Sequence, residues 1–280
     1  MLDHGRWTID HKTKKVNTFN SEWRKVAAAI YKKPVDSKLF GSVEIDVTDL
    51  EIYISEKRKQ GLKITLTHIF LLIVARALKF EVPQLNAYIK RGNVVEREHI
   101  DAMVSVLKED SQMSQIKISD ADTLTLSELT AIMNNEIINT KKGMENKTMK
   151  MKAVLASFPW PLRGWVFKFI RWITIDLGLS FPSIGLSANN FGAFVLTNIG
   201  SIGLDTGYPA LFPTSNVAIV LVMGGVSKKP VVIDDQIVIR RILSLTAALD
   251  HRVVDAIHGG KLFKYIKQVV RNPKVLEEKP

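Results

Sequence analysis

The residues best suited to chemistry lie near the C-terminal end of the chain, in the run DHRVVD at positions 250–255. His251 follows the apolar run Leu243–Leu249 and precedes a stretch with helical periodicity, so we expect it at a strand-to-helix junction. A neutral imidazole accepts a proton near neutral pH and can serve as a general base. If the helix has begun at this point, Asp255 lies about one turn away on the same face. The spacing alone is also typical of a helix-start pair without catalysis.

A second element that suits acyl chemistry is the run FVLTNIGSIG at positions 194–203. It is typical of a strand that enters a glycine turn, with Thr197 at its polar end. A threonine hydroxyl at this point could donate a hydrogen bond to an oxyanion. The glycines match neither GxGxxG nor GxxxxGKS, so no phosphate-binding loop is indicated. By itself, the run is equally typical of an ordinary strand and turn.

The remaining histidines indicate no metal centre. They are dispersed at positions 4, 11, 68, 99 and 258, without an HExxH or comparable spacing. His68 lies in an apolar stretch and is predicted to be a core histidine, whereas His99 is expected on a surface strand. Because the chain has no cysteine, disulfides, thiolate metal sites and a cysteine nucleophile are excluded. Any thioester chemistry therefore needs a thiol that a substrate supplies.

These candidate residues must be positioned by strands and helices in mixed order. We expect helices at 48–60, with Thr48 as N-cap, at 65–80, at 126–140 and at about 253–270. Strands are expected at 40–47, 87–90, 94–97, 100–107, 115–119, 191–199, 216–223, 231–240 and 242–249, with Asp234-Asp235 as the turn between the last two. Since strands outnumber helices and do not alternate with them, the pattern predicts an α+β fold with a mixed sheet, not a doubly wound nucleotide fold.

Composition places limits on partners and location. The 280 residues are 46% hydrophobic, which is enough for a substantial core, and the net charge of +11 attracts anions or forms a solvated basic surface. No zinc finger, RNA-recognition signature or basic zipper is present, so we do not expect nucleic acid as a partner. The N-terminus lacks a signal peptide, and the longest apolar stretch, 64–78, is too short for a membrane span. We expect a cytoplasmic protein, with membrane association left open.

Residues 147–187 differ from the rest of the chain. They contain Trp160, Trp165 and Trp172, three of the five tryptophans, interleaved with lysines and arginines. Such a stretch can lie in a membrane interface, pack on the domain surface or line an acyl pocket. We therefore predict a single catalytic domain over residues 1–280, with an atypical basic insertion at about 144–190, and leave peripheral membrane contact through 147–187 open.

Several ordered motifs resemble the catalytic domain of the 2-oxoacid dehydrogenase dihydrolipoamide acyltransferases. DHRVVDA, preceded by the strand ILSLTAAL, resembles the DHRxxDG signature of that family, and FVLTNIGSIG resembles a segment that carries serine or threonine at the position of Thr197. Further similar segments are FPTSNVAIVLVMGGV, GSVEIDVTDL, LTHIFLLIVARALKFEVPQLNAYI and ISDADTLTLSEL. The chloramphenicol acetyltransferases share the fold and the histidine. The resemblance covers nearly all of the chain outside about 144–190 and implies a chloramphenicol acetyltransferase-like fold.

The resemblance also implies an activity and a set of roles. An acyl group would move between coenzyme A and an acceptor by direct attack, without a metal. His251 would deprotonate the attacking thiol or hydroxyl, and Thr197 would stabilise the tetrahedral oxyanion. Asp255 would order the site through a salt bridge, with Arg24 as its expected partner. Such enzymes are homotrimers with active sites between subunits, so His251 of one chain would face Thr197 of its neighbour.

The chain departs from the family in several places. Ala256 replaces the final glycine of the signature, and SQMSQIKIS at 111–119 replaces a glycine- and proline-containing strand beside the acceptor channel. We find no lipoyl domain, so we expect no covalent lipoyl group on this chain, and the charged C-terminus predicts a trimer without a cage. Three functions remain open: a stand-alone coenzyme A-dependent acyltransferase with a thiol, hydroxyl or amine acceptor, including a carrier-protein thiol; an acyltransferase that uses a lipoyl domain on another chain; and a non-catalytic trimeric scaffold.

Overall fold

A mixed β-sheet forms the centre of the protein. The computed structural model describes residues 37–107, 113–141, 159, 162–181, 190–212 and 215–280. The sheet has six strands in the order β1-β8-β7-β6-β4-β5. Their bounds are β1 (Lys38–Asp46), β4 (Ala102–Leu107), β5 (Met113–Ile118), β6 (Phe194–Asn198), β7 (Ile219–Ile233) and β8 (Gln236–Asp250). β6 runs parallel to β4 and β7, whereas the other neighbours are antiparallel. A separate hairpin joins β2 (Ala87–Lys90) to β3 (Asn93–Glu96).

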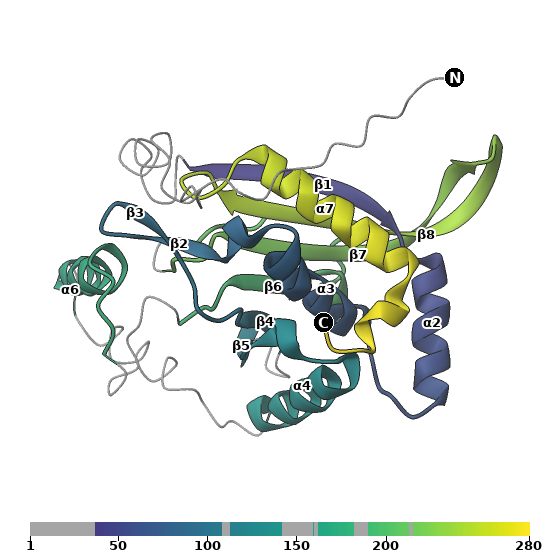
Figure 1. Cartoon of the computed structure of the whole chain (residues 1–280), viewed down its shortest axis with the longest axis horizontal. Helices are drawn as coiled ribbons and strands as arrows, with labels where there is room; N and C mark the ends of the chain where they lie inside the picture. Colours follow the sequence, from purple (N-terminus) through teal and green to yellow (C-terminus); the bar gives the residue numbers. More distant parts are fainter. Residues whose placement is uncertain (1–36, 108–112, 142–158, 160–161, 182–189, 213–214) are drawn as a thin grey trace, which may run out of the picture.

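Helices pack against one face of this sheet (Figure 1). The helices of the described residues are α2 (Thr48–Lys59), α3 (Leu66–Phe80), α4 (Leu126–Lys141), α6 (Leu162–Arg171) and α7 (Ala256–Arg271). α3 and α7 contact one another, while α2 and α4 lie toward the sides of the molecule. This arrangement confirms the predicted α+β class with a mixed sheet and flanking helices.

The core forms around α3, which is buried on all sides. Every residue from His68 to Leu78 is buried, as the nearly continuous apolar run predicts. The helix ends at Phe80, and Pro83 opens a short 3₁₀ helix, Pro83–Asn86. The buried Arg76 guanidinium donates to the carbonyls of Val275 and Glu278, so it ties the C-terminal residues to α3.

The predicted role of Thr48 as an N-cap is wrong. Val47 occupies the N-cap position of α2, and Thr48 is the first helical residue. The N–H and hydroxyl of Thr48 donate to Asp46 Oδ1 at 3.0 and 2.6 Å, and its Oγ1 accepts from Arg241 N at 2.8 Å. Because these bonds reach both neighbouring strands, Thr48 fixes the start of α2 against β1 and β8.

The predicted division of the last strands is also wrong. β7 and β8 each have 15 residues, and they are joined by Asp234-Asp235. Both aspartates have positive φ values, 48° and 59°, as a tight two-residue hairpin turn requires. The turn therefore falls inside the expected strand 231–240, and β8 continues without a break through Arg241. The hairpin projects from the body of the molecule (Figure 1).

Candidate active site

His251 lies in a tight turn between β8 and α7. The N–H groups of Val253 and Val254 donate to the Asp250 carbonyl at 2.9 and 3.1 Å. The N–H of His251 donates to the Ser37 carbonyl at 2.6 Å, which attaches the turn to the start of β1. The predicted start of the last helix at about residue 253 is therefore too early, because α7 begins only at Ala256.

The contacts of the His251 ring define its tautomer. Nδ1 lies 2.9 Å from the Val254 carbonyl and 3.4 Å from Asp255 Oδ1. A carbonyl oxygen can only accept, so Nδ1 carries a proton and Nε2 holds the lone pair in the neutral ring. A quarter of the His251 side chain is exposed, so solvent reaches the imidazole. The ring is thus oriented to accept a proton at Nε2.

A buried ion pair, not singled out from the sequence, braces this turn. Arg252 Nε and Nη2 donate to the two carboxylate oxygens of Asp250 at 2.9 and 2.5 Å, and Arg252 N donates to Asp250 Oδ1 at 3.1 Å. Both side chains are only 6% exposed. The pair therefore clamps the residues on both sides of His251. The sequence did contain a signal for this pair, because Asp250 and Arg252 carry opposite charges directly after the long apolar run Leu243–Leu249.

Asp255 connects the turn to the helix that follows. Its backbone is extended, and its N–H donates to His258 Nδ1 at 3.0 Å at the N-terminus of α7. The expected proximity of Asp255 to His251 is present, although the turn, not a helical turn, brings the two together. Arg24, the expected partner of Asp255, lies outside the described residues. Ala256 is exposed as the first residue of α7, where a methyl group meets no obstacle.

Thr197 lies near the end of β6, partly buried. The next residue, Asn198, is held on the opposite side of the strand, where its Nδ2 donates to Thr67 Oγ1 at 3.3 Å. A β-bulge at Gly224 and Gly225 lets the loop that follows β6 pass close to β7. A Cβ at Gly224 would overlap the Asp205 carbonyl oxygen, so this position needs glycine.

The face of the sheet that carries Thr197 is the one opposite α3. By strand alternation Thr197 shares this face with Val195, which belongs to a small cluster that includes Met103, Val220 and Ala248. Phe40 pairs with Ala248 and is exposed on the same face, with its ring centroid 5.8 Å from that of Tyr208. In the part of the chain that the structure describes, no α-helix covers this face, here called the helix-free face, and it presents the Phe40 and Tyr208 side chains to the exterior.

Within one chain His251 and Thr197 are far apart. Thr197 pairs with Val222 in β7, and Val222 pairs with Thr246 in β8. His251 follows Thr246 by five positions, toward the other end of the sheet. With ~3.3 Å per residue and ~4.8 Å between strands, the two side chains are roughly 20 Å apart. A hydroxyl at that distance cannot contact the same reacting carbonyl as the imidazole.

A cleft of 370 Å³ lies beside the Thr197 end of the sheet. It is lined by residues of α2, the start of α3 and the end of β6: Glu51, Ile54, Ser55, Arg58, Thr65, Leu66, Thr67 and Asn198. Beneath it, buried His68 contacts Thr65 Oγ1 through Nδ1 at 2.7 Å, as predicted for a core histidine. Burial, with a smaller effect from the Arg58 charge, lowers the pKa of His68 to about 4. His68 is therefore neutral at pH 7.

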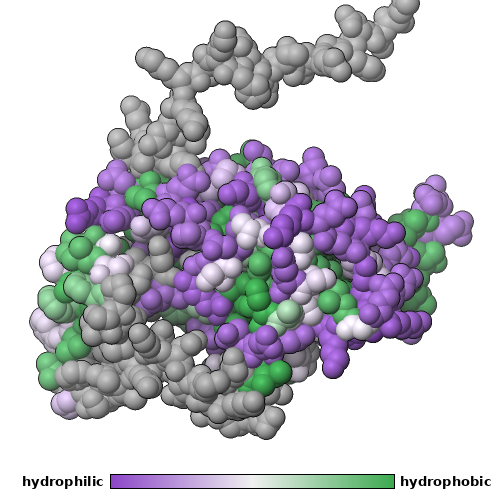
Figure 2. Space-filling model, turned by 60° about the horizontal axis from the view of Figure 1, so that its bottom comes forward, coloured by the Kyte–Doolittle hydropathy of each residue, from purple (hydrophilic) through white to green (hydrophobic). Residues whose placement is uncertain are grey.

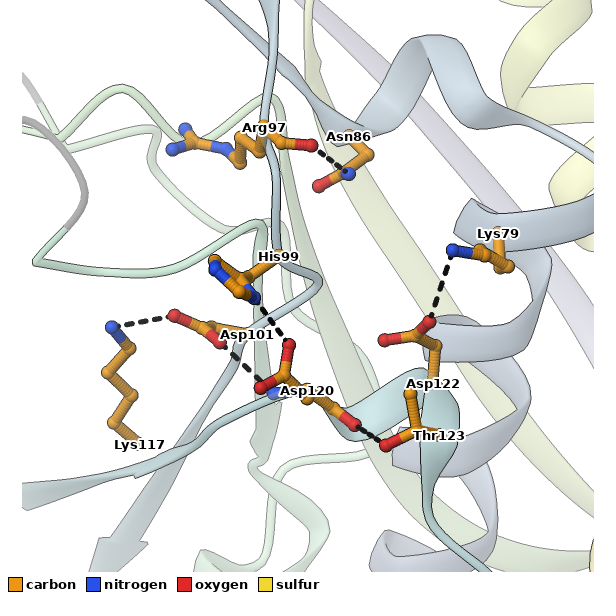
Figure 3. A network of polar contacts seen from close by, with 9 residues as sticks. All are labelled: Lys79, Asn86, Arg97, His99, Asp101, Lys117, Asp120, Asp122 and Thr123. Carbon is orange, nitrogen blue, oxygen red and sulfur yellow. Dashed lines mark hydrogen bonds and ion pairs between the residues drawn. The ribbon is translucent and has the colours of Figure 1, made fainter. Parts of the chain in front are cut away.

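A second polar cluster lies where β4 begins and β5 ends (Figure 3), with β6 and β7 between it and β8. His99 is exposed there as expected, but in a bend before β4, not on a strand. Its Nδ1 lies 2.7 Å from Asp120 Oδ1, and this hydrogen bond is the main reason that the pKa of His99 is raised. Asp101 pairs with Lys117 at 2.7 Å, and its carbonyl accepts from Ala193 N at 2.7 Å. The cluster thus fixes β4, β5 and the approach to β6.

The described residues contain no group of three or more His, Cys, Asp or Glu side chains placed to hold a metal ion. Among their helices, none combines the length and the apolar character needed to cross a membrane.

Comparisons with protein families and curated sequences find acyltransferase catalytic domains. Residues 186–277 match the model described as 2-oxoacid dehydrogenases acyltransferase (catalytic domain). A dihydrolipoyllysine-residue acetyltransferase component of the pyruvate dehydrogenase complex from Acholeplasma laidlawii is 33% identical over 94 residues, which are 33% of this chain and 17% of that protein. A lipoamide acyltransferase component of the branched-chain alpha-keto acid dehydrogenase complex from Bacillus subtilis is 25% identical over 82% of this chain and 46% of its own length. The chain thus spans about half or less of the length of these relatives.

Solved structures share the fold. A probable dihydrolipoamide acetyltransferase from Listeria monocytogenes has a TM-score of 0.63 and 21% identity, and covers 92% of this chain and 91% of its own. A dihydrolipoamide acetyltransferase from Azotobacter vinelandii has a TM-score of 0.61 and 15% identity, with coverage of 86% and 85%. A chloramphenicol acetyltransferase has a TM-score of 0.50 and 13% identity, with coverage of 89% and 94%. The predicted chloramphenicol acetyltransferase-like fold is confirmed.

Proposed function

Residues 186–277 match the family model of the 2-oxoacid dehydrogenase acyltransferase catalytic domain, and on this premise we propose that the protein transfers acyl groups between coenzyme A and a thiol, hydroxyl or amine acceptor. The observation that carries the proposal is the His251 ring, whose Nδ1 donates to the Val254 carbonyl. This contact leaves Nε2 as the ring nitrogen that accepts a proton. The side chain is partly exposed and lies in a rigid turn, as a general base requires.

The proposed reaction proceeds by direct attack. His251 Nε2 takes the proton from the acceptor, and the freed electron pair forms a bond to the thioester carbonyl carbon. The Thr197 hydroxyl donates to the resulting oxyanion. When the tetrahedral intermediate collapses, the bond to sulfur breaks and the imidazolium returns its proton to the coenzyme A thiolate. No acyl-enzyme is formed, and no cysteine of this chain is needed.

The assignment of Thr197 requires a second subunit. With roughly 20 Å between His251 and Thr197 in one chain, the oxyanion donor must come from a neighbour. We propose a homotrimer in which the helix-free face, with Phe40 and Tyr208, packs toward the adjacent subunit. The cleft beside Asn198 lies at the same end of the sheet, on the side of α2 and α3, and is a candidate entrance for acyl-CoA.

A solved relative supports the residue set. The Azotobacter vinelandii enzyme was studied for the role of a serine, a histidine and an asparagine in its catalytic mechanism, the asparagine standing four positions after the histidine. In this chain Asp255 stands four positions after His251, and Thr197 supplies a hydroxyl as the serine does. Asp255 differs in charge, and we propose that it orders the turn through its contact with the ring.

A second candidate function is transfer to or from a dihydrolipoyl group carried by another chain. The names of the relatives, which are lipoamide and dihydrolipoyllysine-residue acyltransferases, favour this acceptor. Both candidates use the same base and the same donor, so they differ only in the acceptor.

The test combines one variant with an acceptor panel. Purified protein is given acetyl-CoA, longer acyl-CoA donors and either free dihydrolipoamide or a set of alcohols and amines, and products are identified by mass spectrometry. We expect His251→Ala to lose about 10²–10⁴-fold in turnover. His99→Ala, which removes an exposed imidazole from another part of the sheet, should retain activity. Equal turnover in both variants would exclude the assignment.

A further inference from the structure

Helix α6 and the turn after it present a row of exposed aromatic side chains. Trp165 is 73% exposed, Phe169 60% and Trp172 51%. Their spacing of four and three residues places them on one side of the helix, with Leu162 on the same side. Figure 2 shows hydrophobic surface at the edge of the molecule where Figure 1 places α6. Large aromatic groups that face outward in a row mark an interaction surface.

The opposite side of this segment attaches it to the body of the protein. Thr174 and Ile175 are buried, and the Ile175 carbonyl faces Asn216 Nδ2 at 3.5 Å. At the β2–β3 turn, Arg91 N donates to the Asp176 carbonyl at 3.1 Å. The π-helical turn Trp172–Asp176 is thus held by the core, and the aromatic side of the adjoining α6 is exposed.

Cationic side chains border the aromatic row. Lys168 is exposed and lies next to Trp165 and Trp172 around the helix, and Arg171 is half-exposed in the last turn. From Leu162 to Ile175 the sequence contains no acidic residue. The β2–β3 turn places Arg91, also exposed, beside the same segment. The edge of this surface is therefore positive, in a chain with a net charge of +11.

We infer that α6 lies in the headgroup region of an anionic phospholipid bilayer, with Trp165, Phe169 and Trp172 at the acyl boundary. The helix has ten residues, about 15 Å, so it can lie along a membrane but cannot cross its ~30 Å core. Tryptophan favours the bilayer interface, and lysine and arginine beside it attract anionic headgroups. A protein partner is less well matched, because a stable interface needs about 800 Å² per side, far more than one short helix face supplies.

The test uses the intact protein and vesicle flotation. Vesicles of phosphatidylcholine alone are compared with vesicles that contain about one third phosphatidylglycerol. We expect binding to the anionic vesicles that exceeds binding to the neutral ones by at least tenfold, because more than one cation contributes. Trp165→Gln/Trp172→Gln should weaken binding about tenfold or more. Lys168→Gln/Arg171→Gln should weaken it about 30-fold, about fivefold per cation.

Matched controls lie on other surfaces of the chain. Ile237→Gln/Ile239→Gln removes two side chains that are 78% and 72% exposed on the β7–β8 hairpin. Lys261→Gln/Lys264→Gln removes two exposed cations from α7. Both controls should bind vesicles as the parent does, and thermal melting checks that all variants are folded. Equal binding to neutral and anionic vesicles, or an equal loss in the controls, would overturn the inference. A lower oligomeric mass in the α6 variants with unchanged vesicle binding would assign this surface to a second copy and would overturn it too.

Discussion

Replacing Asp250 with alanine should destabilise the protein strongly, because it leaves the Arg252 guanidinium buried without its carboxylate. The pair is 6% exposed on each side and makes three hydrogen bonds, two of them from the guanidinium fork. Removing one partner of such a buried pair costs about 3–5 kcal/mol. At about 2–4 °C per kcal/mol for a large domain, we expect the midpoint of thermal unfolding to fall by about 6–20 °C.

The matched control is Asp49→Ala, which removes a carboxylate whose ion pair with Arg240 is at the surface. Asp49 Oδ2 lies 2.9 Å from Arg240 Nη2, but its side chain is 75% exposed. Loss of an exposed pair costs less than about 1 kcal/mol. The double variant Asp250→Ala/Arg252→Met should recover much of the stability, since no buried charge remains.

The assay is thermal and urea unfolding, followed by circular dichroism, together with turnover. Asp250→Ala should also lower kcat more than it raises KM, because the clamped turn orients His251. A change in unfolding midpoint no larger than that of Asp49→Ala would refute the reasoning. The reasoning would also be refuted if the double variant lost as much stability as Asp250→Ala and Arg252→Met lose together when each is measured alone.

Two further predictions concern the core and the bulge. Burial lowers the pKa of His68 to about 4 from its usual 6.5, so the unfolded state binds more protons than the folded state between these pH values. Through this group, the free energy of unfolding should fall by about 3 kcal/mol from pH 7 to pH 4. Urea titrations of His68→Gln should show no such contribution. An acid-induced loss of the same size in both proteins would contradict the assignment. Gly224→Ala should destabilise by about 1–3 kcal/mol because its Cβ meets the Asp205 carbonyl, whereas Gly260→Ala, with open space in α7, should stabilise by about 0.5–1 kcal/mol. Equal unfolding midpoints for the two glycine variants would contradict this account.

Much of the fold could be predicted because local signals were strong. The apolar run of α3 is long enough to be distinguished from a strand, and its burial follows from its composition. The turn at Asp234-Asp235 was predicted correctly, but the bounds of β7 and β8 were wrong because Arg240 and Arg241 interrupt an apolar run. Their guanidinium groups pair with Asp46 and Glu51, about 190 positions earlier in the chain. Such partners allow two charges to remain inside a strand, and no local pattern reveals them.

The candidate site could be predicted in its residue types but not in its geometry. The DHRVVD run and its resemblance to the family signature made His251 and Asp255 candidates, whereas their spacing alone is equally typical of a helix-start pair. The tautomer depends on the Val254 carbonyl, and the turn depends on Ser37, which immediately precedes β1 more than 200 positions earlier in the chain. The separation of Thr197 from His251 follows from sheet order, and periodicity in a single sequence does not specify which strands are neighbours.

The most direct test of the central claim mixes two inactive chains. His251→Ala and Thr197→Ala are co-expressed with different tags, and mixed oligomers are purified through both tags. If each site combines His251 of one subunit with Thr197 of the next, one of the three sites in every mixed trimer regains both groups. We therefore predict that acyl transfer in the purified mixed trimers returns to about a third of the parent rate per site. Mixed oligomers no more active than the two variants alone would contradict a site shared between subunits.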